Sequence, residues 1–339
     1  MLMLLLLAPA ARAADTPLPH PAGHAIRQAQ ARVVKIYGAG GYRGMEPYQS
    51  GLLISSDGLI LTVWSYVLDT DHITATLDDG RKFEAKFLGA DPRLEVAVLK
   101  IEAGDLPCFD LAETPTLESG AGVFAVSNLF GVATGDEPAS VQRGTVSVVT
   151  HLEARHGVFE TPYHGLVYVL DVTTNNPGAA GGALITRRGQ LAALLGKELR
   201  NSLNNTWLNY AVPVGELRES VEAIRAGKFA ARPEQSPEKT PSRPMLLATL
   251  GIVLVPEVLE RTPAYVDQVR PGSAAARAGL RPDDLIILVG SHLTASCKAL
   301  RGELAWIDRE DRLPLTILRG QDLVEVQLQL SDEEKQAAP

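Results

Sequence analysis

The chain has 339 residues, 45% hydrophobic and 21% charged, a composition typical of a folded globular protein and not of a disordered one. Its length predicts two domains, with one large β or α/β domain as the alternative. The formal net charge of −8 excludes a large phosphate-binding surface, so nucleic acid is not an expected partner. The two cysteines, Cys108 and Cys297, are too few for a disulfide framework and have no zinc-ligand spacing, and we expect no metal and no cofactor.

The first residues predict export. Residues 2–7 form an unbroken apolar run, and Ala-Arg-Ala at 11–13 has the small-x-small pattern that signal peptidase accepts. We therefore expect a signal peptide at 1–13 and an N-terminal segment at 14–31 in a periplasmic or extracellular protein. A frayed apolar start on a cytosolic protein is the alternative, but it leaves the polar, Pro-rich stretch at 15–23 unexplained. No later apolar run approaches the roughly 20 residues that a membrane span requires.

Short apolar or alternating runs, separated by Gly, Asp and Asn, fill most of the chain before its Pro-rich segment, which is typical of antiparallel strands joined by turns. The runs 51–54 and 59–62 flank Asp57-Gly58, a dipeptide that supplies the positive φ angle of a hairpin turn. Many strands and few helices favour a barrel or a sandwich. Apolar residues at helical spacing predict a short amphipathic helix over 215–226, which closes a domain placed at 32–228.

The rest of the chain divides at a proline-rich segment. Residues 229–244 contain four prolines among charged and polar residues, with little that can be buried, so we predict a semi-extended linker. A second domain is expected at 245–331, which is the length of one small module and ends in an alternating strand at 324–328. Residues 332–339 are predicted to form a charged tail.

Several separated motifs resemble those of the HtrA (DegP-like) serine proteases, in the same order and with the same spacing. They are Ser-Gly-Leu-Leu-Ile at 50–54, Asp-Gly-Leu-Ile-Leu-Thr at 57–62, Leu-Asp-Asp-Gly-Arg at 77–81, Asp-Pro-Arg at 91–93 and Asn-Pro-Gly at 176–178. The resemblance extends over nearly the whole chain after the expected signal peptide. It implies a mainly β fold, with a chymotrypsin-like double β-barrel followed by a small α+β PDZ domain.

The second domain contains a loop that resembles the carboxylate-binding loop of PDZ domains, Thr-Leu-Gly-Ile at 249–252. A glycine flanked by apolar residues lets consecutive N–H groups converge on a terminal carboxylate, and the strand that follows offers an edge for an added peptide strand. The resemblance therefore implies that Leu250, Gly251 and Ile252 bind polypeptides or C-terminal peptides. The alternative is that Gly251 only relieves a tight turn.

The catalytic positions depart from the family pattern. A serine protease of this type needs a hydroxyl nucleophile, an imidazole base and a carboxylate that orients the imidazole. Where the family has His, Asp and Ser, this chain has Ser65, Glu95 and Ala180. Gly178 and the backbone N–H of Ala180 retain an oxyanion-hole-like sequence, although the folding of the turn explains its glycines equally well.

We interpret the chain as an exported pseudoprotease that binds polypeptides as a chaperone, scaffold or regulator, with active HtrA-type proteases among its expected partners. The alternative is an active serine endopeptidase of extracytoplasmic protein quality control, with displaced catalytic residues. Little in the sequence favours it, since Ser65 lacks the basicity of imidazole and His72 lies in a stretch that varies within the family. Three further histidines lie in a predicted loop between second-barrel strands: His151, His156 and His164.

The resemblance also implies an oligomer. Proteases of this family commonly form trimers through aromatic residues near the mature N-terminus. Tyr37, Tyr42 and Tyr48 are available there, without an obvious matching pattern. A homotrimer is the resulting expectation.

Overall fold

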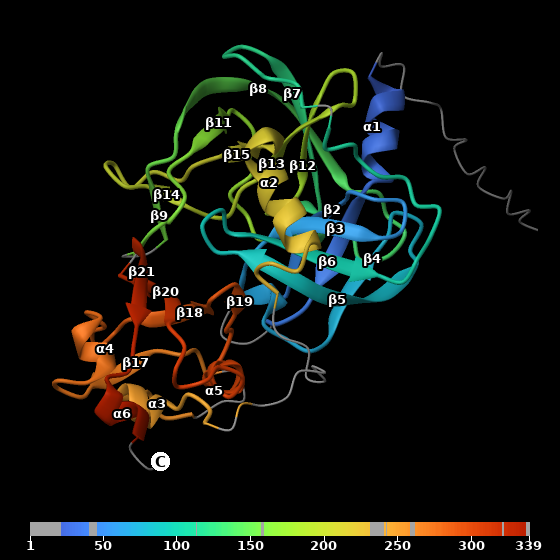
Figure 1. Cartoon of the computed structure of the whole chain (residues 1–339). Coiled ribbons are helices and arrows are strands. Elements are labelled where there is room, and N and C mark those ends of the chain that lie inside the picture. Colours follow the sequence, from blue (N-terminus) through green and yellow to red (C-terminus); the bar gives the residue numbers. More distant parts are fainter. Residues whose placement is uncertain are drawn as a thin grey trace, which may run out of the picture.

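The computed structural model describes residues 22–40, 46–112, 114–156, 159–230, 241, 243–257, 262–320 and 322–336. The expected signal peptide, Tyr42 and most of the Pro-rich linker lie outside these residues. Two six-stranded antiparallel β-barrels are followed by a smaller domain that holds two β-sheets (Figure 1). Within the described residues, no helix combines the length and the apolar character needed to cross a membrane.

The first barrel closes through the strand order β1-β2-β3-β6-β5-β4. Its hairpin between β2 and β3 turns at Asp57-Gly58, where the φ angle of Gly58 is 97°, and this confirms the predicted turn. After β3, the short 3-10 helix η1 (Tyr66–Leu68) leads toward β4. The six strands are β1 (Val33–Tyr37), β2 (Tyr48–Leu53), β3 (Leu59–Val63), β4 (Ile73–Thr76), β5 (Lys82–Asp91) and β6 (Val96–Ile101).

The second barrel closes through the order β11-β15-β13-β12-β7-β8. Its strands are β7 (Gly122–Ser127), β8 (Ser140–His151), β11 (Leu166–Leu170), β12 (Ala183–Thr186), β13 (Leu191–Leu195) and β15 (Tyr210–Pro213). A small separate sheet contains β9 (Ala154–His156), β10 (Phe159–Glu160) and β14 (Arg200–Asn201). Outside the sheets are η2 (Leu129–Gly131), α1 (Gly23–Gln30) and α2 (Val214–Arg225). Helix α2 confirms the helix predicted over 215–226.

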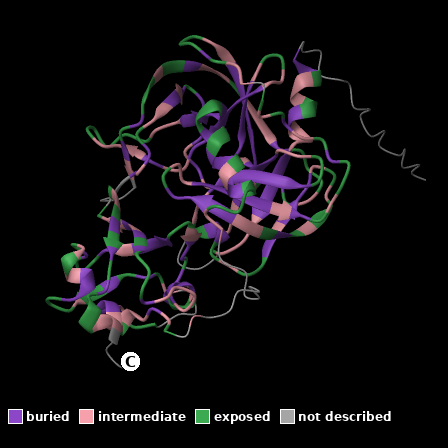
Figure 2. Ribbon diagram, viewed as in Figure 1, coloured by how far each residue is buried: buried purple, intermediate pink, exposed green. Residues whose placement is uncertain are grey.

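The strands of the first barrel are apolar on both faces because they contribute to two cores. In β6, Val96 and Val98 belong to a cluster that continues into the second barrel through Phe124. Ala97 and Leu99, which point the other way, belong to a second cluster within the first barrel. Successive side chains of a strand alternate between its faces, so one apolar run serves both cores. Figure 2 shows buried residues concentrated in the strands of the two barrels.

The Asp-Pro-Arg motif fixes the turn between β5 and β6. The side chain of Asp91 is fully buried and accepts hydrogen bonds from Arg93 Nη2 at 2.7 Å and from Ser220 Oγ of α2 at 2.6 Å. Burial alone would raise the pKa of the Asp91 carboxyl, but these hydrogen bonds outweigh it and the pKa lies below its usual value. The motif thereby holds α2 against the first barrel and positions the next residues, up to Glu95.

The smaller domain is α+β, as expected from the sequence (Figure 1). One sheet pairs β16 with β17, and the other has the order β19-β18-β20-β21. The strands are β16 (Ile252–Leu254), β17 (Val266–Val269), β18 (Leu285–Val289), β19 (His292–Leu293), β20 (Leu313–Arg319) and β21 (Asp322–Leu328). The helices are α3 (Leu247–Leu250), α4 (Ala274–Arg277), α5 (Cys297–Leu304) and, within the expected charged tail, α6 (Asp332–Gln336).

A β-bulge in β18 allows this strand to pack against both domains. The register with β20 shifts between Ile286 and Leu288. Ile286 lies in the core of the smaller domain, whereas Ile287 and Leu288 join Leu293 in the cluster of the first barrel. An extra residue at a bulge breaks the strict alternation of side chains, so two neighbours face the same side. The smaller domain is thus docked through its own sheet.

The first two residues of the expected linker reinforce this docking. The Phe229 N–H donates to the Ser291 carbonyl at 2.8 Å, and the Phe229 carbonyl accepts from the Ala90 N–H at 3.1 Å. The Leu293 N–H donates to the Ala230 carbonyl at 3.1 Å. The linker therefore begins with a residue, Phe229, that is hydrogen-bonded to both domains, followed by Ala230, which is hydrogen-bonded to the smaller domain.

Candidate functional site

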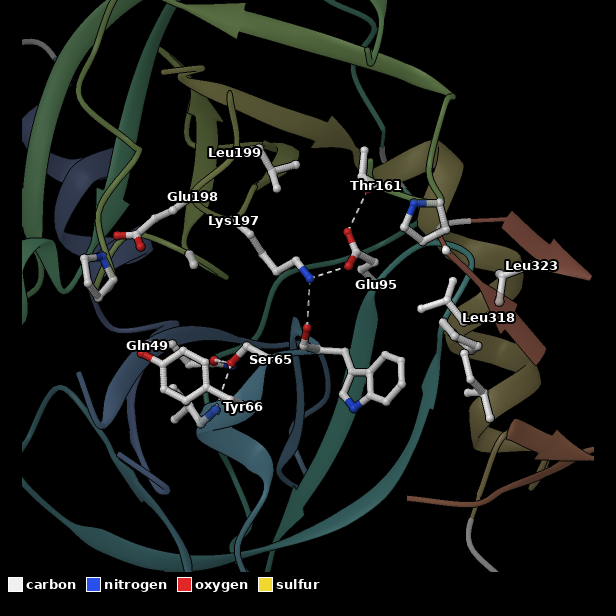
Figure 3. Close-up of a pocket in the computed structure, with 18 of the residues that line it drawn as sticks. Gln49, Ser65, Tyr66, Glu95, Thr161, Lys197, Glu198, Leu199, Leu318 and Leu323 are labelled. Carbon is white, nitrogen blue, oxygen red and sulfur yellow. Dashed lines mark hydrogen bonds and ion pairs between the residues drawn. The ribbon is translucent and has the colours of Figure 1, made fainter. Parts of the chain in front are cut away.

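A pocket of about 340 Å³ lies where the two barrels meet the smaller domain (Figure 3). Ser65, Glu95 and Ala180, the residues that the sequence predicts at the three catalytic positions, all line it. The structure thus brings together three residues that the sequence places far apart. The smaller domain contributes one wall of the pocket: Tyr265, Ile287, Leu318, Gly320 and Leu323.

Ser65 follows β3 and begins η1. Its Oγ accepts a hydrogen bond from the Val67 N–H at 3.2 Å and donates one to Gln49 Oε1 at 2.5 Å. The Gln49 amide is itself buried and donates to Thr62 Oγ1 at 2.7 Å. The Ser65 hydroxyl, which the sequence predicts at the position of the family's histidine, is therefore held by the Gln49 amide and by the first turn of η1.

Glu95 occupies the turn between β5 and β6 with a left-handed φ angle of 53°. Its carboxylate forms an ion pair with Lys197, which follows β13, and accepts a hydrogen bond from Thr161 Oγ1 at 2.8 Å. Lys197 Nζ also donates to the Trp64 carbonyl at 3.3 Å, as the dashed lines in Figure 3 indicate. Only 21% of the Glu95 side chain and 24% of the Lys197 side chain are exposed. At the centre of the pocket, the carboxylate thus pairs with a lysine.

No motif in the sequence marks Lys197 as a site residue. It is a single lysine at the end of the fully buried strand β13, and it lies 102 residues from its partner Glu95. A lone cation after an apolar run is usually a solvated strand end. Gln49 and Thr161 belong to no catalytic motif, so the sequence pattern did not predict them as site residues either.

Ala180 and Gly178 lie in the loop before β12. The Gly178 carbonyl accepts from Ser50 Oγ at 2.7 Å, and the Ala180 carbonyl from the Ser50 N–H at 2.9 Å. The N–H groups of Gly178 and Ala180 have no hydrogen-bond partner within the described part of the chain. A Cβ at position 178 would meet the Asn128 carbonyl oxygen at 1.8 Å, so close packing alone requires glycine there. Packing therefore requires a glycine at position 178, and the N–H groups of Gly178 and Ala180 remain unpaired within the described residues.

No imidazole reaches this pocket, because none of its described lining residues is a histidine. The side chain of His72 is 88% exposed, and its Nδ1 lies 3.3 Å from Glu84 Oε1 on β5. His151 and His164 are also exposed. The side chain of His156 lies outside the described part of the structure.

The expected carboxylate-binding loop forms the end of α3. The side chains of Leu250 and Ile252 are buried in the core of the smaller domain, so only their backbone can contact a ligand. Gly251 ends α3 with a φ angle of 79°. The Leu250 N–H donates to the Leu246 carbonyl at 3.0 Å, and the Gly251 N–H to the Ala248 carbonyl at 3.3 Å. Two of the three expected N–H groups are therefore already used within this turn.

Strand β16 has an open edge. It pairs with β17 alone among the described strands, and the Gly251 carbonyl accepts from the Arg270 N–H at 2.8 Å. At the other end of the strand, the Val255 N–H donates to the Tyr265 carbonyl at 3.0 Å. Since backbone groups alternate in direction along a strand, the N–H of Ile252 points toward the free edge. An added peptide strand would find its first donor there.

Lys197→Met is expected to lower the free energy of unfolding by about 1–3 kcal/mol, because it leaves a largely buried carboxylate with Thr161 as its only side-chain donor within the described residues. The matched control is Lys86→Met, which removes a lysine from an ion pair with Glu102 whose side chains are 70% and 75% exposed. That change should cost below about 1 kcal/mol. Urea denaturation measures both values. Equal losses in the two variants would contradict a structural role for the Lys197–Glu95 pair.

Comparisons with known proteins agree with this architecture. Residues 49–194 match the family of trypsin-like peptidase domains, and residues 265–319 match PDZ domains. The solved structure of the HtrA-type protease AlgW with tripeptide has a TM-score of 0.50 at 23% sequence identity, covering 91% of this chain and 96% of that one. This similarity supports the fold.

Curated relatives extend the agreement to sequence. The putative serine protease HhoB of Synechocystis is 29% identical over 80% of this chain. The periplasmic serine endoprotease DegP of Escherichia coli is 28% identical over 83% of it, and a probable DegP-like endoprotease of Pseudomonas fulva is 31% identical over 74%. The chain spans 63%, 56% and 48% of these relatives, respectively. With its two barrels, its PDZ domain and these relatives, the chain is a homologue of the HtrA/DegP serine proteases.

Proposed function

We propose that this protein is an exported HtrA-like pseudoprotease, which binds polypeptides and does not hydrolyse them. One observation carries the proposal: Ser65, Glu95 and Ala180 line a single pocket, and the described residues around them include no nucleophile paired with a base. The Ser65 hydroxyl is hydrogen-bonded to the Gln49 amide, and the Glu95 carboxylate forms an ion pair with Lys197. The side chain of Ala180 is only a methyl group. We therefore propose that the double barrel of a serine protease is retained without a working nucleophile and base.

Lys197 does not replace the missing base. Its Nζ is the cationic partner of Glu95 and a donor to the Trp64 carbonyl, so it has no lone pair to accept a proton from a nucleophile. Loss of either the serine or the histidine of a serine-protease triad costs about a millionfold in kcat. Any residual acceleration from substrate binding would be negligible beside that loss.

Two features support a binding role. The PDZ match and the open edge of β16 favour the capture of polypeptide C-termini.

The names of the relatives place those proteins in the periplasm, which agrees with the predicted signal peptide and supports the same location for this chain. Within this compartment we propose a chaperone, scaffold or regulator, alone as a homotrimer or together with active HtrA-type proteases.

Incubation with casein and with a fluorophosphonate probe tests the loss of hydrolysis. We expect no turnover above the buffer rate and no specific labelling, because the pocket has no activated hydroxyl. An active DegP-type protease serves as the positive control. The proposal fails if the protein degrades casein and is labelled, and if changing one remaining serine or histidine, such as Ser65→Ala, abolishes both.

A further inference from the structure

The pocket contains a second carboxylate, Glu198, which is not part of the ion pair between Lys197 and Glu95. Glu198 follows Lys197 after β13, and its side chain lines the pocket. It is partly buried, and within the described part of the chain it has neither a hydrogen-bond donor nor a cation as a partner. The neighbouring cation, Lys197, is already paired with Glu95. A partly buried carboxylate without a partner is unfavourable, and a ligand cation would relieve it.

Two tyrosines accompany this carboxylate. Tyr48 and Tyr66 line the same pocket. Burial raises the pKa of each phenol, and the charge of Glu198 raises it further, with the charge of Glu46 ahead of it at Tyr48. The Tyr66 hydroxyl donates to the Glu46 carbonyl at 3.0 Å, which fixes the ring. Burial and repulsion from the Glu46 carboxylate also raise the pKa of Glu198. A carboxylate in a pocket that aromatic rings also line has the chemistry that recognises an ammonium or a guanidinium group.

The opposite end of the pocket is apolar. Leu318 and Leu323 of the PDZ domain lie there, and Figure 3 shows them on the other side of Lys197 from Glu198. The lining of this wall also includes Ile287. A ligand that fills the pocket must therefore present an apolar group at one end and a cation at the other. An extended polypeptide offers both on neighbouring side chains.

We propose that this pocket selects polypeptide segments in which a lysine or arginine side chain pairs with Glu198, beside Tyr48 and Tyr66, while a nearby apolar side chain contacts Leu318 and Leu323. The inference rests on the proposed function, because it names the kind of polypeptide that the inactive cleft binds. It concerns the cleft and not the capture of C-termini by the PDZ domain. Recognition of internal segments requires no free carboxylate.

Binding of short labelled peptides to the full chain tests the inference. The peptides are N-acetylated and C-amidated, so that the PDZ loop has no terminal carboxylate to capture, and each contains a leucine one, two or three positions from a lysine. The matched set replaces the lysine with norleucine, which keeps the length of the apolar stem and removes the charge. Fluorescence anisotropy gives the dissociation constants.

We expect the best lysine peptide to bind at least about tenfold more tightly than its norleucine counterpart, and Glu198→Gln to remove this preference while the norleucine affinity stays the same. Glu118→Gln, which changes an exposed carboxylate outside the pocket, should preserve the preference. If lysine and norleucine peptides bind equally to the unaltered protein, selection by Glu198 is wrong, but the proposed binding of polypeptides stands. If neither set binds, the proposed binding function of the cleft fails as well.

Discussion

Leu288→Asp is expected to release the PDZ domain from the first barrel while both domains remain folded. Leu288 is 5% exposed and packs in the cluster of the first barrel, and not in the core of its own domain. Loss of a buried leucine costs about 1.5–3 kcal/mol, and a buried, unpaired carboxylate adds several more. Release of the domain avoids the second cost, because it exposes the carboxylate at position 288 to water.

Small-angle X-ray scattering should record this release as an increase in the radius of gyration. Amide hydrogen exchange should accelerate at Phe229 and Leu293, whose N–H groups donate hydrogen bonds in the docked arrangement. The matched control is Leu203→Asp, since Leu203 is 86% exposed and its replacement should leave both signals unchanged. If Leu288→Asp keeps the radius of gyration and the slow exchange, the interdomain packing contributes little to the docking.

Gly251→Ala is expected to weaken the binding of peptides with a free C-terminus by at least about tenfold. Gly251 has a φ angle of 79°, and a Cβ there would lie 2.2 Å from the Cβ of Ser273. The methyl group must therefore displace the loop that presents the backbone donors, including the N–H of Ile252. In the unaltered protein, C-terminal amidation should cause a comparable loss, because the terminal carboxylate is the group that we propose this loop binds.

Gly272→Ala provides the matched control for backbone strain. Gly272 has a similar φ angle of 72°, but a Cβ there meets no atom within 4 Å. In both variants, alanine in the left-handed conformation lowers the free energy of unfolding by about 1–2 kcal/mol. Only Gly251→Ala is expected to move the loop. Isothermal titration with paired free and amidated peptides measures the effect. Equal affinities of the two variants, or no effect of amidation on the unaltered protein, would overturn the assignment of this loop.

Local patterns in the sequence predicted much of the fold. The alternation of apolar residues gave the strands of the barrels, Asp57-Gly58 gave a hairpin turn, and helical spacing gave α2. Such features depend on neighbouring residues, which repeat with the period of the structure that they form. The motifs around Ser65, Glu95 and Ala180 also led to one pocket, because the resemblance placed each of them at a known point of the double barrel.

Long-range contacts decided what occupies that pocket. Glu95 meets Thr161 and Lys197 from the second barrel, 66 and 102 residues further along the chain. The contacts of β18 with the first barrel depend on a bulge, which is a property of its register with β20 and leaves no periodic signature in one strand. The residues that fill the cleft and the sheet that covers it could not be predicted from local spacing.

The amino-acid sequence by itself predicted the double-barrel and PDZ architecture, and it led to the proposal that catalytic side chains are missing, because both inferences depend on residue identity and short-range pattern. Only the tertiary structure decided that Lys197 pairs with Glu95, that Glu198 has no partner within the described residues, and that the PDZ domain forms one wall of the cleft. These contacts form between residues that are distant in the sequence, when the barrels and the PDZ domain pack together. That packing decides which charged side chains are buried and which of them are paired.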